Sequence, residues 1–227
     1  MCDQMKKGIL LIISFFFIEP AFAYSQNIDH KIAIWTKKIE QEIKKDSIKK
    51  ENFEDVDTVK RKLRSLVEFD QQFRNEFSAD LENSQLPELF FKIDKHHTDI
   101  LKRILAIHVW VNISKFGKEA DHNAWLLVQH ADQDLFFQAG VAFILQQLVL
   151  LGETNKANYA YLYDRVALKL ARFDIKQRYG TQAFIEEGKI KISPYEGSIQ
   201  SINKNRAEMG LESMHIYLQK LKTVYQL

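Results

Sequence analysis

Residues 59–77 read VKRKLRSLVEFDQQFRNEF, and this stretch decides the fold class. Its apolar residues recur at intervals of three or four, which is the period of one face of an α-helix. One position of the stripe is polar, because Asp70 stands where the period calls for an apolar residue. The stretch therefore predicts an amphipathic helix whose buried face carries a carboxylate. The apolar members of the stripe are Val59, Leu63, Leu66, Phe73 and Phe77.

The same periodicity on both sides of this stretch predicts a mainly helical chain. One apolar stripe runs from Ile28 to Ile43, and Pro87 opens a helix that we expect to end near Ile107. Residues 108–117 stay ambiguous, since their apolar part is locally strand-like. Further helices are predicted over residues 119–130, 135–151, 159–171, 199–209 and 212–225. Residues 135–151 are apolar on almost every side, which predicts a place at the centre of the bundle.

A change of period near the C-terminal third predicts a small β-hairpin. Residues 176–184 and 189–192 alternate in polarity, and Glu186-Glu187-Gly188 separates them as a turn. Gly180, within the first predicted strand, indicates a bulge or a close backbone approach. The predicted fold class is mainly α: a single helical-bundle-like domain with one small β-hairpin.

Composition and charge exclude several classes of protein. The chain is 46% hydrophobic with a formal net charge of +2, whereas disordered chains combine low hydrophobicity with high net charge. The chain has no strong excess of basic residues, so its charge does not favour nucleic acid as a partner. The one lysine-rich run, within residues 37–50, is interleaved with acidic residues and is typical of a solvated helix face.

The N-terminal residues are typical of a signal peptide. Lys6 and Lys7 precede the apolar run 9–18, and Ala21-Phe22-Ala23 forms a small-residue cleavage site. The run is about half the roughly 20 residues of a membrane span, so an uncleaved anchor is the less favoured alternative. We expect cleavage after Ala23, a periplasmic or secreted domain over residues 24–227, and no stable membrane span after cleavage. Cys2 is the only cysteine, so that domain would have no disulfide and no thiolate ligand.

Two polar clusters lie in the first two thirds of the chain. Asp70 and Arg74 are four residues apart and can pair on one helix face, unless Phe69 takes the core position and turns Asp70 outward. His97 lies on the apolar stripe of its helix and is best interpreted as a core or boundary histidine whose hydrogen bonds are satisfied. The second cluster closes the helix 119–130 and comprises Gln129, His130 and Asp132.

The second cluster has both a structural and a chemical interpretation. Asp132 stands where the N-cap of the next helix belongs, which would explain it completely. Imidazole beside carboxylate is also the chemistry of a general base or of a metal ligand. His122 lies eight residues before His130, which is not a close metal-ligand spacing, so we expect no metal site.

Two more polar clusters follow in the last third. Tyr161, Asp164 and Arg165 share a helix face, and Gln177–Gln182 form a dense run of hydrogen-bonding side chains. Period-two alternation separates Tyr179 from Arg178 and Gln182 on the predicted strand. Arg206, on the next helix, could join the group. An exposed edge hairpin without a site is the alternative.

The order of these motifs resembles the bacterial domain-of-unknown-function family numbered 6624. The matching elements are D-Q-x-x-R from Asp70, W-L-L-V-Q-H-A-D from Trp125, Y-L-x-D-R-V from Tyr161, Q-x-Y-G-T-Q from Gln177 and R-x-x-x-G-L from Arg206. The resemblance spans roughly residues 55–217. This chain departs from the pattern at Val109-Trp110-Val111, where Gly-Trp-Pro is expected. The resemblance implies no activity.

Three functions are compatible with this inventory. The first is an exported hydrolase acting on an anionic or polar small substrate, with His130 as general base and Asp70 or Asp164 orienting it. Asp132 would be a further acid/base group. The alternatives are a non-catalytic ligand-binding module and an interaction protein whose polar cluster is a buried structural network. We expect no cofactor. The predicted substrate-binding residues are Arg74, Gln129, Arg165, Arg178, Tyr179, Gln182 and Arg206.

Overall fold

The computed structural model describes residues 28–78, 80 and 83–225. The predicted signal peptide and its cleavage site after Ala23 lie outside these residues. The described chain divides into two compact units, one ending at Asp134 and the other beginning at Leu135. No helix in the described ranges is long and apolar enough to span a membrane.

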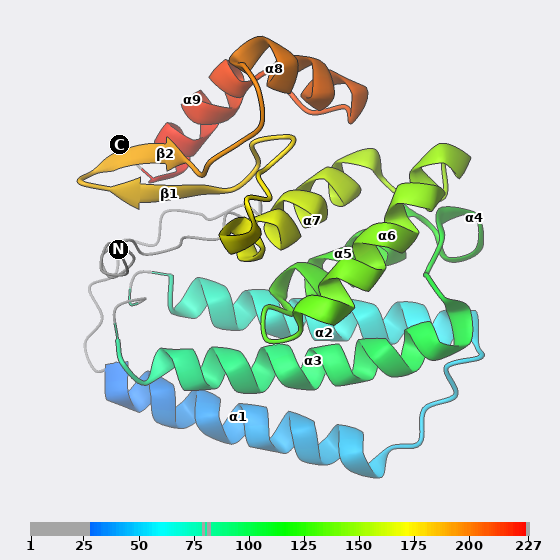
Figure 1. The fold of residues 1–227 in the computed structure, drawn as a ribbon. Coiled ribbons are helices and arrows are strands. Elements are labelled where there is room, and N and C mark those ends of the chain that lie inside the picture. Colours follow the sequence, from blue (N-terminus) through cyan, green and yellow to red (C-terminus); the bar gives the residue numbers. More distant parts are fainter. Residues whose placement is uncertain (1–27, 79, 81–82, 226–227) are drawn as a thin grey trace. The chain divides into compact units, whose positions relative to one another are not determined.

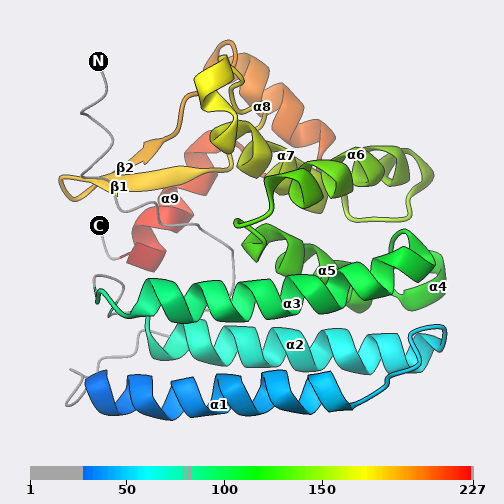
Figure 2. The ribbon, with the colours of Figure 1, turned by 60° about the horizontal axis from the view of Figure 1, so that its bottom comes forward.

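Three long helices form the base of the first unit. They are α1 (Ile28–Ile48), α2 (Val56–Glu76) and α3 (Leu86–His108), and they run side by side in alternating directions (Figures 1 and 2). Asp55 caps α2 by accepting a hydrogen bond of 2.7 Å from the backbone N–H of Thr58. Two shorter helices follow, α4 (Ile113–Phe116) and α5 (Lys118–His130), and α5 packs against α2 and α3. The predicted helices of this unit are therefore confirmed.

The apolar stripes meet in one core. Trp35 from α1 and Phe73 from α2 pack edge to face, with ring centroids 5.4 Å apart. Phe73 also packs against Phe90 of α3 at 4.8 Å. Each long helix thus contributes an aromatic or branched side chain to the interior. The buried members of this cluster are Ile32, Trp35, Ile39, Phe73, Phe77, Leu86, Leu89 and Ile93.

The ambiguous segment after α3 contains a tight turn rather than a strand. Val109 has φ 62° and ψ −52°, and the N–H of Trp110 bonds the carbonyl of His108 at 2.6 Å. This is a γ-turn with a β-branched residue in a conformation that glycine favours. The turn therefore lies at the Val109-Trp110-Val111 segment where Gly-Trp-Pro was expected, and a glycine at position 109 would adopt this positive φ without strain.

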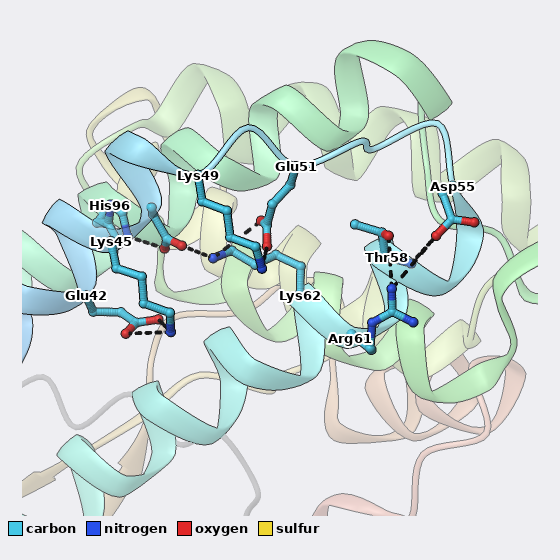
Figure 3. Close-up of polar contacts among 10 residues, drawn as sticks. Glu42, Lys45, Lys49, Glu51, Asp55, Thr58, Arg61, Lys62 and His96 are labelled. Atoms are coloured by element: carbon cyan, nitrogen blue, oxygen red, sulfur yellow. Dashed lines mark hydrogen bonds and ion pairs between the residues drawn. The ribbon is translucent and has the colours of Figure 1, made fainter.

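A polar network ties the end of α1 to its neighbours (Figure 3). Lys62 of α2 is buried and pairs with Asp46 of α1, and Asp46 also lies 2.9 Å from His96 Nε2 of α3. Burial opposes ionisation of Asp46, but the hydrogen bonds from Lys62 and His96 hold its pKa below the usual range. Glu51, in the loop after α1, pairs with Lys49 at 2.8 Å. The lysines of residues 37–50 are exposed, as predicted.

The second unit joins a helix pair to a hairpin and two final helices. Helix α6 (Leu135–Leu151) packs against α7 (Lys156–Lys169), which a short 3₁₀ turn (Ala171–Phe173) follows. Strands β1 (Ala183–Glu186) and β2 (Lys189–Ile192) pair antiparallel, and α9 (Met214–Tyr225) packs on α8 (Ile199–Glu208) and on β2. The core of this part is Ala183, Ile202, Met214, Tyr217 and Leu221.

The prediction of where the hairpin begins was wrong. Strand β1 starts at Ala183 rather than at residue 176, and residues 177–182 form an irregular loop. Buried side chains, described below, take the hydrogen bonds that a partner strand would have taken. The predicted close approach at Gly180 is confirmed, because its φ is +62° and an added Cβ would lie 2.3 Å from Met214 Cε.

Two predictions about α6 were also wrong. The helix is not central, because it buries a single face that includes Val141, Ala142 and Leu145. Four of its other apolar residues are exposed, namely Phe136, Phe143, Leu150 and Leu151. The helix begins at Leu135, so Asp134 rather than Asp132 immediately precedes it. Asp132 lies in the turn after α5.

Candidate functional site

Asp70 is the centre of a charged cluster in the first unit. It is fully buried on α2, so the alternative in which Phe69 turns it outward is excluded. Arg74 Nε donates to its Oδ1 at 2.9 Å, which confirms the predicted pair, and Gln71 Nε2 donates to its Oδ2 at 2.8 Å. His130 Nδ1 lies 3.1 Å from the same Oδ2, which is an ion-pair distance, but the two atoms are not aligned for a hydrogen bond. Burial alone would raise the pKa of Asp70, but the charges of His130 and Arg74 hold it well below its usual range.

A second carboxylate, which the sequence analysis missed, completes this cluster. Asp94 of α3 pairs with Arg74 Nη2, and the Arg74 guanidinium also lies over the Phe90 ring, 5.1 Å from its centroid. Burial opposes the charge of Arg74, but Asp70 and Asp94 raise its pKa above the usual value. A signal was present in the sequence, because Asp94 directly follows the core residue Ile93 and precedes His97 by three positions.

His130 is the last residue of α5 and is 6% exposed. The helix positions it against Asp70, while Gln129 is buried beside it in the chain. Asp132, two residues on, lies close enough to Arg74 to favour its charged form. Three of the four predicted catalytic residues, His130, Asp132 and Asp70, thus belong to one unit, and so do the predicted binding residues Arg74 and Gln129.

His97 is buried next to this cluster, at 2% exposure. Its ring packs edge to face on Phe69, with centroids 6.2 Å apart. Burial lowers the pKa of His97 to about 3, although Asp70 acts in the opposite direction. Nδ1 of His97 has no hydrogen-bond partner among the described residues. The interpretation as a core histidine is confirmed by its burial, but the expectation that its hydrogen bonds are satisfied is not met at Nδ1.

The cluster contains a donor set that could hold a cation. Ligand atoms of Asp70, Asp94 and His130 lie within 4.8 Å of one another. Two carboxylates and an imidazole are suitable ligands for a divalent ion. Arg74 already donates to both carboxylates, however, so an ion would have to displace those bonds. His122 is not part of the set and packs beside Trp125, at 5.2 Å between ring centroids.

The fourth predicted catalytic residue, Asp164 of α7, has a different environment. It accepts backbone hydrogen bonds from Arg178 at 2.8 Å, Tyr179 at 3.1 Å and Thr181 at 2.8 Å, and a fourth from the Thr181 hydroxyl at 2.9 Å. Burial raises the pKa of Asp164 to about 6, against the effect of these four bonds. The geometry is that of a carboxylate holding a loop in place.

The remaining polar residues of the loop hold one another. Gln177 Nε2 donates to the carbonyls of Gln182 and Ser193, at 3.1 and 2.7 Å, and the N–H of Gln182 donates back to Gln177 Oε1 at 2.7 Å. Arg165 Nη1 lies 3.5 Å from Gln182 Oε1. All three side chains are buried, so the predicted binding residues Arg165 and Gln182 take part in the loop's own bonding.

Arg206 of α8 closes the loop from the other side. It is fully buried, and it donates to the carbonyl of Tyr179 at 2.9 Å and to that of Glu212 at 2.6 Å. Its guanidinium lies 4.6 Å from the centroid of Tyr217, whose hydroxyl donates to the carbonyl of Thr181 at 2.6 Å. Carbonyl acceptors and an aromatic face account for Nε and Nη1 of this buried arginine, whereas its Nη2 has no hydrogen-bond partner among the described residues.

Arg178 differs from the other predicted binding residues of the second unit because its side chain is exposed. It borders a cavity of about 300 Å³ between α6 and α7. Tyr179 is buried beneath it, and its ring lies edge-on to Tyr159 and Tyr163, at 6.2 and 5.9 Å between centroids.

The comparisons with known proteins place the chain in a family. The sequence model of the family of unknown function DUF6624 matches residues 57–227, so the chain belongs to this family, as its motifs indicated. No curated protein matches the chain, and no solved structure does.

Proposed function

We propose that the protein is an exported hydrolase in which His130 acts as general base and Asp70 orients it, acting on a small polar or anionic substrate. The single observation that supports this proposal is the 3.1 Å contact between His130 Nδ1 and the fully buried Asp70 carboxylate. Export is inferred from the signal-like order of residues 6–23.

The charges around Asp70 determine the tautomer of His130. An ionised carboxylate only accepts hydrogen bonds, and the lowered pKa of Asp70 means that it is ionised at physiological pH. The hydrogen of a neutral His130 therefore belongs on Nδ1, and Nε2 is the nitrogen that takes a proton from water. Asp70 then stabilises the imidazolium that forms, as in His–Asp pairs generally.

The residues behind Asp70 keep this pair in position. Arg74 and Gln71 bind both carboxylate oxygens, and Asp94 holds Arg74 from the other side. A general base needs such orientation because proton transfer depends on distance and angle. Arg74 is the proposed contact for the substrate. Asp132 is the proposed acid/base group for the second proton transfer.

A non-catalytic function is the second candidate, and one observation favours it. The polar residues around Asp164 bond one another in a closed interior of the second unit. A fully bonded polar network of this kind can serve stability alone. In that case the pair His130–Asp70 would be another structural ion pair.

The test is a turnover screen with chromogenic esters, phosphate esters, glycosides and peptide amides. It uses residues 24–227 and the variants His130→Ala, Asp70→Asn and His122→Ala. We expect one class to be cleaved, with kcat lowered about 10²–10⁴-fold in the first two variants, since general base catalysis is worth that much. His122→Ala is the matched control, because it removes an imidazole from the same helix without touching Asp70.

Asp70→Asn separates catalysis from structure. An amide at this position donates to Nδ1 and thereby imposes the wrong tautomer, so kcat should fall while KM changes little and the pH profile shifts. Full turnover in His130→Ala would refute the role of His130. If every substrate fails and Asp70→Asn changes only stability, the structural alternative is correct.

A further inference from the structure

A groove lined mainly by apolar side chains lies between α6 and α7 in the second unit. Its volume is about 300 Å³, at the lower end of the range of small-molecule sites. The walls are aliphatic and aromatic, and include Ala139, Ala142 and Phe143 of α6 and Tyr159 and Tyr163 of α7. Ile175, after the 3₁₀ turn, also lines the groove.

The groove exposes apolar surface that α6 does not use for packing. Phe143 lines the groove and is 68% exposed, and Ile175 is 37% exposed. Burying such surface under a ligand is favourable roughly in proportion to its area. The small side chains at positions 139 and 142 leave room for a chain to lie between the helices.

A single charge borders this apolar space. Arg178 is the one ionisable residue, apart from two tyrosines, among the described residues that line the groove. In the described part of the chain its guanidinium has no ion-pair partner, whereas Arg64, Arg74 and Arg206 each bind an acceptor. The backbone at Arg178 is fixed, because its N–H donates to Asp164 and its carbonyl accepts from Asn205 Nδ2 at 3.1 Å.

We propose that this groove binds a medium-chain fatty-acid anion. The hydrocarbon chain would lie between α6 and α7, and the carboxylate would pair with Arg178, whose planar fork suits it. At roughly 30 Å³ per non-hydrogen atom, by analogy with the volume of a water molecule, the space of about 300 Å³ fits about ten such atoms, which corresponds to the carbon chain of decanoate with its carboxylate oxygens outside at Arg178. The anchored backbone of Arg178 holds the cation at the rim of the groove. This site is independent of the proposed chemistry at His130.

The test is isothermal titration of residues 24–227 with decanoate, decanol and decylamine, each below its micellar concentration at pH 8. Decanoate should bind saturably with one site, decanol at least tenfold more weakly, and decylamine more weakly still. A charge-assisted hydrogen bond is worth a factor of ten or more in affinity, which sets the expected difference between the first two.

Two variants and one control assign the binding to the groove. Arg178→Gln should lower decanoate affinity at least tenfold and leave decanol affinity unchanged, because only the charge is lost. Ala139→Trp should abolish the binding of both by filling the groove. Arg172→Gln is the matched control, since Arg172 is exposed on the 3₁₀ turn and lies outside the lining.

Three results would overturn the proposal. The first is absence of saturable decanoate binding. The second is equal decanoate affinity in wild type and Arg178→Gln. The third is an equal loss in Arg178→Gln and Arg172→Gln, which would mean a general electrostatic effect. Circular dichroism of each variant confirms that the comparison is made between folded proteins.

Discussion

The buried imidazole of His97 makes a quantitative prediction about stability at acid pH. Burial lowers the pKa of His97 to about 3, whereas a histidine in the unfolded chain titrates near 6.5. Between these values the unfolded chain binds a proton at His97 and the folded protein does not. Stability from this residue is therefore fully present above about pH 6.5 and is lost as the pH falls toward 3.

The magnitude follows from the unfolded pKa alone, as long as the folded pKa is well below the working pH. Each pH unit below about 6.5 costs about 1.4 kcal/mol, so His97 should cost about 2 kcal/mol between pH 7.5 and pH 5.0. Asp164 acts in the opposite direction. Its folded pKa is raised to about 6, so the folded protein gains stability as the pH falls below that value. The wild-type curve alone is consequently not diagnostic.

A difference between variants isolates the contribution of His97. His97→Leu replaces the ring by an apolar group of similar size against Phe69, and His215→Leu is the control, since it removes an exposed imidazole of α9. Free energies of unfolding are measured by urea denaturation at pH 7.5 and pH 5.0. Wild type and His215→Leu should each lose about 2 kcal/mol more over this interval than His97→Leu does.

Equal pH dependence in wild type and His97→Leu would refute the reasoning. It would mean that His97 is protonated in the folded state and paired with Asp70. The charge of Asp70 would then offset the effect of burial on the pKa of His97. Histidine NMR titration gives an independent check, because the ring signals of His97 should not move between pH 7.5 and pH 5.0.

Two further predictions concern stability. Val109→Gly should stabilise the protein by about 1 kcal/mol, because the strain that it removes from a β-branched residue at positive φ exceeds the added backbone entropy cost of glycine. Chemical denaturation would show it, and a loss of stability would exclude the γ-turn. Lys62→Met should destabilise by about 3–5 kcal/mol, since it leaves Asp46 buried without its lysine. Adding Asp46→Leu should recover most of this loss, and a double variant as unstable as the single one would contradict the ion-pair explanation.

The helices of the first unit were predictable because each one is specified by the local spacing of its apolar residues. Each stripe of three and four spacings places its members on one face, and that face is buried in the structure, as at Leu63 and Leu66. The same rule failed for α6, because apolarity on every side shows only that a helix has much to bury. Whether a helix has enough neighbours to bury it depends on the packing of segments distant in sequence. For α6 these neighbours do not cover every side, since Phe136 is 91% exposed.

The start of the hairpin was not predictable for a related reason. Residues 177–182 alternate like a strand, but their backbone groups bond side chains from Asp164, Gln177 and Arg206. Alternation reports a repeating preference of side chains, and it carries no information about which group takes the backbone hydrogen bonds. Gly180 was the one local sign in the sequence that the segment leaves the strand conformation, and in the structure its φ is positive.

Asp70 and Asp164 show where sequence reasoning about a site stops. Both are aspartates on helices with an arginine within four residues, and both were predicted as catalytic. The partners of Asp164 are largely backbone N–H groups 14 to 17 residues away, which no residue type announces. The partners of Asp70 are side chains of Arg74, Gln71 and His130. Backbone donors fix a carboxylate as part of the fold, whereas a histidine partner can pass a proton on. For this reason the proposed hydrolase mechanism uses Asp70 rather than Asp164.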